Sequence, residues 1–327
     1  MSEVRILLSD QAAPTLRAAL AQALAQRPWR IVSPHDVGVD ADIAFVTRDV
    51  TGLSTKHEWL PETRHFYDTM RHAPSLDWVH VHSAGADRQI FIDLMARGVR
   101  VTTSSGTNAS VVAQTALAGL LSLARRLPQL ARAQQAHAWA PLLKTGLPPD
   151  LEGQTAVIVG WGAIGQQIAA VLAVLGVRVV AVRRSATPSP PAQDTIRYDE
   201  LATVLPRTDW LVLACPLNAQ TEGLLDAQAL ARLPAGAHVV NVARGEVIDE
   251  AALVAALQQG HLAGAYLDVF AHEPLAAPSP LWDLPNVIVT PHSAGFSAGN
   301  AQRVEQRFLN NLTRWLDGQP LLSLANG

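Results

Sequence analysis

Three side chains of complementary chemistry lie just after three successive predicted strands of this 327-residue chain. Arg244 follows the strand 238–242, Glu273 lies beyond the strand 263–268, and His292 follows the strand 287–290. A guanidinium can bind a carboxylate through two N–H groups, and an imidazole can transfer a proton near neutral pH. Because ligands of open α/β sheets bind at the carboxyl ends of strands, we expect the three to converge. Taken singly, they are better explained as a surface ion pair, a solvated acid and a structural histidine, but their occurrence together on consecutive strand ends favours a functional site.

A glycine turn between a strand and a helix is the second chemical signal. Residues 155–159 form a short apolar run typical of a strand buried on both faces, and Gly160, Gly162 and Gly165 follow with G-x-G-x-x-G spacing. The first glycine permits a sharp turn, the second lets a pyrophosphate approach the backbone, and the third lets helix and strand pack closely. The strand–turn–helix context favours a dinucleotide site over a tight turn without a ligand.

The next strand, 178–182, ends where the adenosine ribose of such a nucleotide would lie. Folds that use NAD place an acid there, about 20 residues beyond the glycines. This chain has Arg183, Arg184 and Ser185, and the first acid after them is Asp194. Two guanidinium groups would attract a 2′-phosphate, so the sequence predicts a preference for NADP, with NAD possible as well. The alternative is that both arginines are solvated loop charges.

The bulk composition indicates a globular protein of about two domains. The chain is 49% hydrophobic and 16% charged, with a net charge of −3, which leaves no electrostatic footprint for nucleic acid or an anionic membrane. The single cysteine, Cys215, excludes an intrachain disulfide and favours a reducing, cytoplasmic location. The amino-terminal residues are too charged for a signal peptide, and no apolar run is long enough to span a membrane.

Strands and helices alternate in two series, which predicts two parallel sheets. In the first series we expect strands at 4–8, 43–46, 78–81 and 99–102, and helices at 11–26 and 87–97. The loop Ser83-Ala84-Gly85 precedes the second of these helices, and N–H groups at a helix start could hold a carboxylate. An ordinary turn explains this loop equally well.

Two helices, over about 111–127 and up to 138, separate the series, and Trp139 follows them. Further strands are expected at 178–182, 210–214, 238–242, 263–268 and 287–290, and further helices at 163–175, 253–259 and 300–316. His80 and His82 share one strand face, but no third ligand has suitable spacing, so no metal site is predicted.

Four motifs in this order resemble those of the D-isomer-specific 2-hydroxyacid dehydrogenase family. They are the glycine turn and the segments NVARGEVID (241–249), DVFAHEP (268–274) and TPHSAG (290–295). The likeness covers most of the chain, and its first half is most similar to the glyoxylate and hydroxypyruvate reductases. It implies two doubly wound α/β domains with a cleft between them. Residues 1–103 plus 293–327 would form a flavodoxin-like substrate domain, and residues 104–292 a Rossmann nucleotide-binding domain.

The resemblance also implies an activity and a set of site residues. A small 2-keto acid would be reduced to the D-2-hydroxy acid, with Arg244 binding the carboxylate, His292 supplying a proton and Glu273 orienting the imidazole. The residues expected to bind the cofactor are Gly160, Gly162, Ala163, Ile164, Gly165, Arg183, Arg184, Ser185, Cys215, Pro216, Val242, Ala243, Asp268 and His292. Those expected to bind the substrate are Ser83, Ala84, Gly85, Trp139, Arg244 and His292.

The role expected of Trp139 depends on the predicted homodimer. The Ala- and Leu-rich helices could form an isologous interface in a homodimer. In the resembling reductases an extended arm bears a tryptophan across the dimer, so Trp139 could complete a neighbour's site. A core aromatic next to Pro141 explains it equally well.

Two other functions fit the same motifs. One is a phosphoglycerate-type dehydrogenase that uses NAD, although the sequence shows no added regulatory domain at its C-terminal end. The other is a nucleotide-sensing protein without turnover, as in corepressors of this fold. Turnover of keto acids separates this second alternative from an enzyme.

Overall fold

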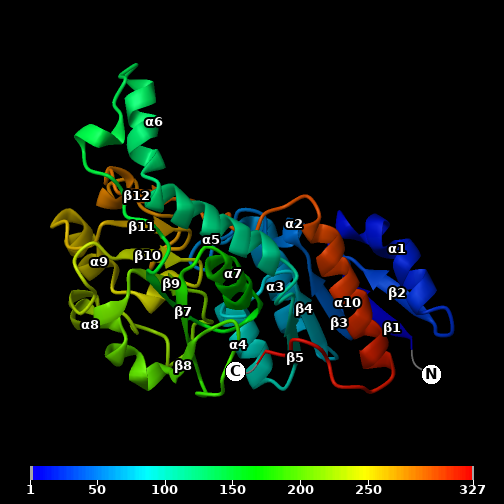
Figure 1. Ribbon diagram of the computed structural model, residues 1–327. Coiled ribbons are helices and arrows are strands. Elements are labelled where there is room, and N and C mark those ends of the chain that lie inside the picture. The colour runs from blue at the N-terminus through cyan, green and yellow to red at the C-terminus, as the bar shows by residue number, and fades with distance from the viewer. Residues whose placement is uncertain (1–2, 326–327) are drawn as a thin grey trace. The chain divides into compact units, whose positions relative to one another are not determined.

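The chain forms two compact units in this computed structural model, which describes residues 3–325 (Figure 1). Unit 1 contains residues 3–108 and 297–325, and unit 2 contains residues 109–296. The sequence analysis placed these two boundaries a few residues earlier. Within residues 3–325, every helix is too short or too polar to cross a membrane.

Unit 1 is built on a parallel five-stranded sheet with the order β2-β1-β3-β4-β5. Its strands are β1 (Val4–Leu7), β2 (Trp29–Val32), β3 (Ile43–Val46), β4 (Trp78–Val81) and β5 (Arg100–Thr103). Its helices are α1 (Ala12–Ala23), α2 (Arg48–Thr51), α3 (Pro61–His72), α4 (Gln89–Ala96) and α10 (Asn300–Leu316). This strand order is the flavodoxin-like, doubly wound arrangement.

Both faces of this sheet are covered because alternate residues of each strand point to opposite sides. On one face Phe45 and Trp78 pack with α1 and α10, and on the other Val46 and Val79 pack with α3 and α4. The sequence analysis missed β2 and α3. The first is an edge strand with the polar Arg30, and the second is a mostly polar helix whose buried residues are Thr63, Phe66, Tyr67 and Met70.

Unit 2 is built on a parallel seven-stranded sheet with the order β12-β11-β10-β9-β6-β7-β8. Its strands are β6 (Thr155–Val159), β7 (Arg178–Arg183), β8 (Asp194–Arg197), β9 (Trp210–Leu213), β10 (His238–Asn241), β11 (Gly264–Leu267) and β12 (Val287–Val289). Its α-helices are α5 (Ala109–Ala124), α6 (Leu127–Gln135), α7 (Ala163–Val174), α8 (Ala227–Ala231) and α9 (Glu250–Gln258). Counted from β6, the first six strands follow the Rossmann order 3-2-1-4-5-6. The two doubly wound parallel sheets predicted from the sequence are therefore confirmed.

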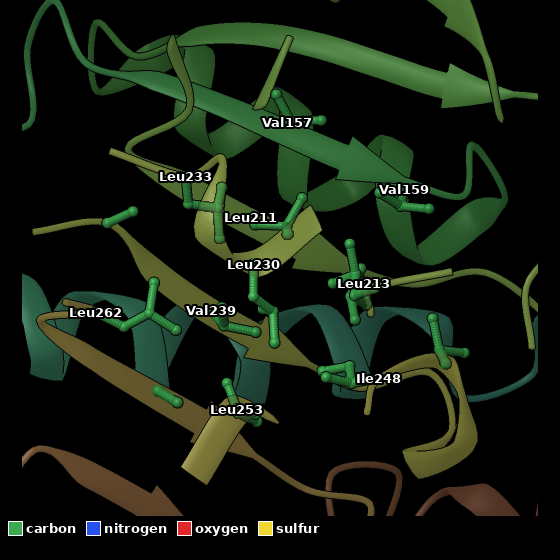
Figure 2. Packing of buried hydrophobic residues seen from close by; sticks show 14 of the residues in the cluster. Val157, Val159, Leu211, Leu213, Leu230, Leu233, Val239, Ile248, Leu253 and Leu262 are labelled. Atoms are coloured by element: carbon green, nitrogen blue, oxygen red, sulfur yellow. The ribbon is translucent and has the colours of Figure 1, made fainter. Parts of the chain in front are cut away.

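The central strands of unit 2 are buried on both faces. Val157, Leu211 and Val239 point to the side of α8 and α9, where they meet Leu230 and Leu253 (Figure 2). The alternate residues of the same strands point to α5 and α7 on the other side. Polar groups can therefore gather only at the edges of the sheet, where the strands end.

His80 is a fully buried histidine of unit 1 whose two ring nitrogens both have hydroxyl partners. Nδ1 lies 2.8 Å from Thr102 Oγ1 and Nε2 lies 3.1 Å from Ser104 Oγ. Burial lowers the pKa of His80 from 6.5 to about 3, and the charges of Arg307 and His82 act in the same direction. The folded protein therefore holds this ring in its neutral form.

We expect the protein to lose stability between pH 6.5 and pH 3. In this window the unfolded chain binds a proton at His80 that the folded chain does not. The free energy of unfolding should therefore fall by up to about 1.4 kcal/mol per pH unit for this group. His80→Gln should flatten the dependence, measured by urea unfolding at pH 7.5 and 5.5. His72→Gln, at an exposed histidine, should keep the wild-type dependence. An unchanged slope in His80→Gln would contradict this assignment.

Candidate active site

The carboxyl ends of six strands in unit 2 form one row. The register pairs Val182, Val159, Leu213, Asn241, Leu267 and Val289 with their neighbours across the sheet. The residues that follow these positions therefore share one edge, with Arg183 on β7 at one side and the loop after β12 at the other. Neighbouring strands are about 4.8 Å apart, so the row is roughly 24 Å long.

His292 and Glu273 form a hydrogen-bonded pair at this edge. His292 Nδ1 lies 2.8 Å from Glu273 Oε2, and Glu273 Oε1 accepts the backbone N–H of Phe270 at 3.2 Å. Half of the His292 side chain is exposed, against 17% of Glu273. Burial opposes ionisation of Glu273, but His292, the Phe270 N–H and the charge of Arg244 together hold its pKa below the usual value. The carboxylate is thus ionised and accepts from the imidazole or lies beside it at hydrogen-bond distance.

Asp268 holds the loop that presents His292. Its Oδ1 accepts the Thr290 hydroxyl at 2.6 Å and the N–H groups of Ser293 and Ala294 at 2.8 and 3.0 Å. His292 itself has a φ of 49°, and its N–H donates to the carbonyl oxygens of Asp268 and Thr290. A left-handed conformation is unusual for a residue with a side chain, and here it is held by these contacts. The Asp268 carboxylate therefore stabilises the loop at residues 290–294, which contains His292.

Arg244 is positioned by a buried amide at the end of β10. Asn241 Oδ1 accepts the N–H of Ala243 at 3.0 Å, and Asn241 Nδ2 donates to the carbonyl of Arg244 at 3.1 Å. The Arg244 guanidinium donates to the Ala243 carbonyl at 2.8 Å. Sequence reasoning missed Asn241. Its signal was an amide at the end of an otherwise apolar strand, where an unsatisfied polar group would be costly.

The loops that bear Arg244 and Glu273 are in direct backbone contact. A Cβ on Gly245 would overlap the main chain of Phe270 and Ala271. The N–H of Ala271 also donates to Glu250 Oε2 at 3.0 Å. Gly245 and Glu250 were not among the predicted site residues, although Gly245 lies in one of the quoted motifs. They set the relative positions of the guanidinium and the Glu273–His292 pair within unit 2.

The three glycines after β6 serve three different purposes. A Cβ on Gly160, whose φ is +104°, would come within 2.5 Å of Cys215 N and 2.6 Å of Ala214. A Cβ on Gly165 would overlap the carbonyl of Gly160, so α7 packs directly on the turn. A Cβ on Gly162 would meet nothing within 4 Å, and α7 begins at the next residue. Gly162 thus leaves open space at a helix N-terminus, which fits a pyrophosphate.

Arg183 and Arg184 mark one end of this row, and no Asp or Glu follows them in the sequence before Asp194. Arg183 is the last residue of β7 and donates to Ser189 Oγ at 3.0 Å, while Arg184 and Ser185 are exposed. The carboxylate of Asp194 lies at the start of β8 and pairs with Arg178, at the opposite end of β7. The first acid after the arginines is therefore at the wrong edge of the sheet to meet a ribose beside Arg183.

The remaining predicted cofactor residues also lie along this row. Cys215 is buried, and burial raises the pKa of its thiol to about 12, while the charge of Arg244 acts in the opposite direction. The others are Ala163 and Ile164 in the first turn of α7, Pro216 after β9, and Val242 and Ala243 after β10. The structure brings these residues together with the glycine turn at one edge, with Cys215 as an inert thiol.

The loop at residues 83–85 lies between β4 and α4, as expected. Helix α4 begins at Gln89 with Arg88 as its N-cap, so the helix start lies several residues beyond Gly85. Instead, the Ser83 hydroxyl donates to the Gly85 carbonyl at 2.7 Å, and the Ser83 carbonyl accepts the N–H of Ser104. Ala84 lies within this turn. The helix predicted to start at residue 87 therefore starts two residues later, at Gln89, and substrate binding by this loop stays a prediction.

Trp139 is not a core aromatic. Its surface is 96% exposed, and the interpretation of a buried residue next to Pro141 was wrong. Helix α5 starts near the His292 loop, where Thr115 Oγ1 donates to the Ala294 carbonyl. The helix ends near the start of β11, where Leu123 approaches Gly264. Trp139, after α6, therefore belongs to an arm that leaves unit 2 from the edge opposite Arg244 (Figure 1).

His82, like His80, is a buried histidine with a structural contact. His82 Nε2 lies 2.8 Å from Thr51 Oγ1, and burial lowers its pKa to about 3, with Arg48 and Arg88 acting in the same direction. Among residues 3–325, there is no group of three His, Cys, Asp or Glu side chains that could hold a metal ion.

Comparison with known families gives a match over residues 117–294, more than half of the chain. The matching family model is the D-isomer specific 2-hydroxyacid dehydrogenase, NAD binding domain. The chain belongs to this family. Its members are NAD(P)-dependent oxidoreductases, and the matched segment contains the glycine turn, Arg244, Glu273 and His292.

Individual relatives extend the likeness to the rest of the chain. A D-3-phosphoglycerate dehydrogenase of Mycobacterium tuberculosis is 34% identical over 305 residues, 92% of this chain and 54% of that protein. The chain thus spans about half the length of the first curated relatives that it matches. A glyoxylate/hydroxypyruvate reductase of Arabidopsis thaliana is 34% identical over 259 residues, 78% of each chain.

A solved structure shows the same two-domain fold. It is the NADPH-dependent glyoxylate/hydroxypyruvate reductase of Sinorhizobium meliloti in complex with NADP and sulfate. That protein has a TM-score of 0.77 and 27% sequence identity, with 100% of this chain and 98% of that chain covered.

The glycine turn provides a matched pair of substitutions. Gly162→Ala should fold like the wild type, because its Cβ enters open space, but should weaken NAD(P)H binding at least about tenfold by occupying the approach of the pyrophosphate. Gly160→Ala should instead lower the melting temperature by several degrees, because its Cβ meets backbone atoms. Cofactor titration by fluorescence and thermal unfolding separate the two effects. Unchanged cofactor affinity in Gly162→Ala would show that no nucleotide passes this residue.

Proposed function

We propose that the chain reduces a small 2-keto acid of the glyoxylate or hydroxypyruvate type to the D-2-hydroxy acid, using NAD(P)H. The observation that carries the proposal is the convergence of Arg244 and the hydrogen-bonded His292–Glu273 pair at one sheet edge with the glycine turn. The names of the reductases among the relatives support the substrate class.

The roles of the side chains follow from their chemistry. Arg244 binds the substrate carboxylate with its planar N–H groups and polarises the neighbouring carbonyl. The bound cofactor supplies a hydride to the carbonyl carbon. His292 donates a proton to the carbonyl oxygen as negative charge develops there, and Glu273 stabilises the protonated ring and fixes its orientation. The loop at residues 83–85 of unit 1 is proposed to bind the substrate as well.

A turnover assay with a panel of 2-keto acids tests this function. His292→Asn should lower kcat by about 10²- to 10⁴-fold and leave the dissociation constant for NADPH close to wild type. Arg244→Ala should raise KM and lower kcat together. Wild-type turnover in His292→Asn would overturn the assignment. Absence of turnover with every keto acid, together with tight nucleotide binding, would favour a nucleotide-sensing protein.

A phosphoglycerate-type dehydrogenase is the second candidate, supported by the 34% identity over 305 residues to a D-3-phosphoglycerate dehydrogenase. The same panel distinguishes the two when it includes 3-phosphohydroxypyruvate. A kcat/KM for this compound above that for hydroxypyruvate would select the second candidate.

NADP is the proposed preferred cofactor. Arg183 is the last residue of β7 and Arg184 follows it, next to the strand that precedes the glycine turn, and Asp194 pairs with Arg178 at the other edge. The guanidinium groups would bind a 2′-phosphate through charge-assisted hydrogen bonds. The presence of NADP in the related reductase structure supports this preference.

Arg183→Ala should lower kcat/KM for NADPH by about 10- to 10²-fold, because one charge-assisted bond is lost, and should leave NADH nearly unaffected. Arg183→Asp should reverse the preference by accepting from the ribose hydroxyl of NADH. Arg178→Ala removes the same charge at the opposite end of β7 and should leave both values unchanged. Equal kcat/KM values for NADPH and NADH in the wild type would refute the preference.

A homodimer is proposed from the arm that follows α5. Trp139, Leu143 and Leu147 are 96%, 79% and 67% exposed, which is unfavourable for apolar side chains in water. A second copy could cover them, and Trp139 would then belong to the partner's site rather than to its own.

Sedimentation at micromolar concentration should show a dimer. Trp139→Ala should raise KM for the keto acid while the NADPH dissociation constant stays the same. Trp282→Ala, at an exposed tryptophan of a different loop, is the control and should leave KM unchanged. A monomeric wild type would rule out this role of Trp139.

A further inference from the structure

We propose that Tyr266 is a positioning residue for His292, acting through Thr290 and Asp268. The inference rests on the proposed function of His292 and adds to it a line of hydroxyl groups that runs from the core of unit 2 to the catalytic loop. Tyr266 lies in β11 and is almost fully buried.

The direction of the hydrogen bonds in this line is determined by counting protons. Thr290 Oγ1 lies 2.6 Å from Asp268 Oδ1 and 2.8 Å from the Tyr266 hydroxyl oxygen. A hydroxyl has a single hydrogen, and an ionised carboxylate only accepts. Thr290 therefore donates to Asp268, and Tyr266 donates to Thr290. Burial raises the pKa of Tyr266 to about 12, with Thr290 opposing and Asp268 adding to the rise, so the phenol keeps its proton.

The carboxylate at the end of this line determines the shape of the catalytic loop. It accepts the N–H groups of Ser293 and Ala294, directly after His292. Burial raises the pKa of Asp268, while the donors from Thr290, Ser293 and Ala294 and the charge of His292 oppose the rise. Each donor removed makes protonation of Asp268 easier, and a protonated Asp268 has less capacity to accept from the loop.

Helix α5 fixes the other end of the line. Gly119 faces the Tyr266 ring so closely that a Cβ there would overlap it, and Thr115 Oγ1 lies 3.2 Å from the Ala294 carbonyl oxygen and 3.0 Å from the Val111 carbonyl oxygen. The phenol is therefore held between a helix and a sheet, and its hydroxyl has a fixed position relative to Thr290. A ring anchored in this way can transmit its position to the His292 loop.

The titratable groups that face the Asp268 carboxylate in the described chain are His292, from the loop after β12, and Tyr266, from β11. Glu273 and Arg244 act on it through His292, since Glu273 bonds the imidazole and Arg244 lies near Glu273. Thr115 from α5 and Thr290 are uncharged. A change in the acid limb of the pH profile on removing the Tyr266 hydroxyl would therefore report on Asp268 and its donors.

The test compares four variants of the full chain. Tyr266→Phe should lower kcat about three- to tenfold and move the acid limb of the kcat profile to higher pH, with the NADPH dissociation constant within twofold of wild type. Thr290→Val, which breaks both bonds, should lower kcat more than tenfold. Thr290→Ser keeps both bonds and should stay within threefold of wild type. Tyr67→Phe is the matched control, because it removes a buried hydroxyl that bonds Arg88 in unit 1, and it should leave the pH profile unchanged.

A second measurement does not depend on turnover. Hydrogen exchange of the Ser293 and Ala294 amides in the protein without cofactor should be at least threefold faster in Tyr266→Phe and at least tenfold faster in Thr290→Val. Wild-type pH profiles and exchange rates in both variants would overturn the proposal, and so would Thr290→Ser behaving like Thr290→Val. An active His292→Asn would instead overturn the proposed function, whatever the exchange rates.

Discussion

The parallel register of the seven-stranded sheet is the constraint on which the candidate site depends. Because all seven strands run in one direction and both faces are covered by helices, the only place for polar chemistry is the edge where the strands end. The register pairs from Val182 to Val289 bring six strand ends into one row. The order of the strands then places Arg183 at one end, the glycine turn beside it, and His292 at the other.

Close approach of backbone segments is what turns this row into a site. Gly160 lets the first turn touch the end of β9, Gly165 lets α7 touch the turn, and Gly245 lets the loop after β10 touch the loop after β11. None of these contacts leaves room for a side chain. Gly162 alone of the three glycines in the turn faces open space, which separates it from the two glycines required by packing.

Each of three acids has its own hydrogen-bond or ion-pair partner, and the positions of these acids determine how charge is distributed along the row. Asp268 is almost fully buried and holds the His292 loop, Glu273 holds the imidazole, and Asp194 is paired with Arg178 at the far edge. Asp268 and Glu273 have specific hydrogen-bond donors, as charges removed from water require, while Asp194 is in an exposed ion pair. The carboxylates of Asp268 and Glu273 therefore lie near His292. The positively charged Arg183 and Arg184 lie at the other end of the row, where they would attract a phosphate.

The sequence by itself determined the fold class, the order of the motifs and the residues that follow each strand. Apolar runs with two-residue or 3.6-residue periodicity set these features locally, and parallel strands must bring their ends to one edge. It failed where the local pattern was weak, as for the edge strand β2 and the polar helix α3.

Only the tertiary structure decided how the chemistry is supported. The contact of Gly245 with Phe270, the placement of the Tyr266 ring against Gly119 and the exposure of Trp139 join or separate residues that are far apart in the chain. Such contacts depend on register, helix packing and the exact room left between elements, which no single stretch of sequence encodes. The three candidate side chains could therefore be named from the sequence, while the groups that hold them in place were visible only in the tertiary structure.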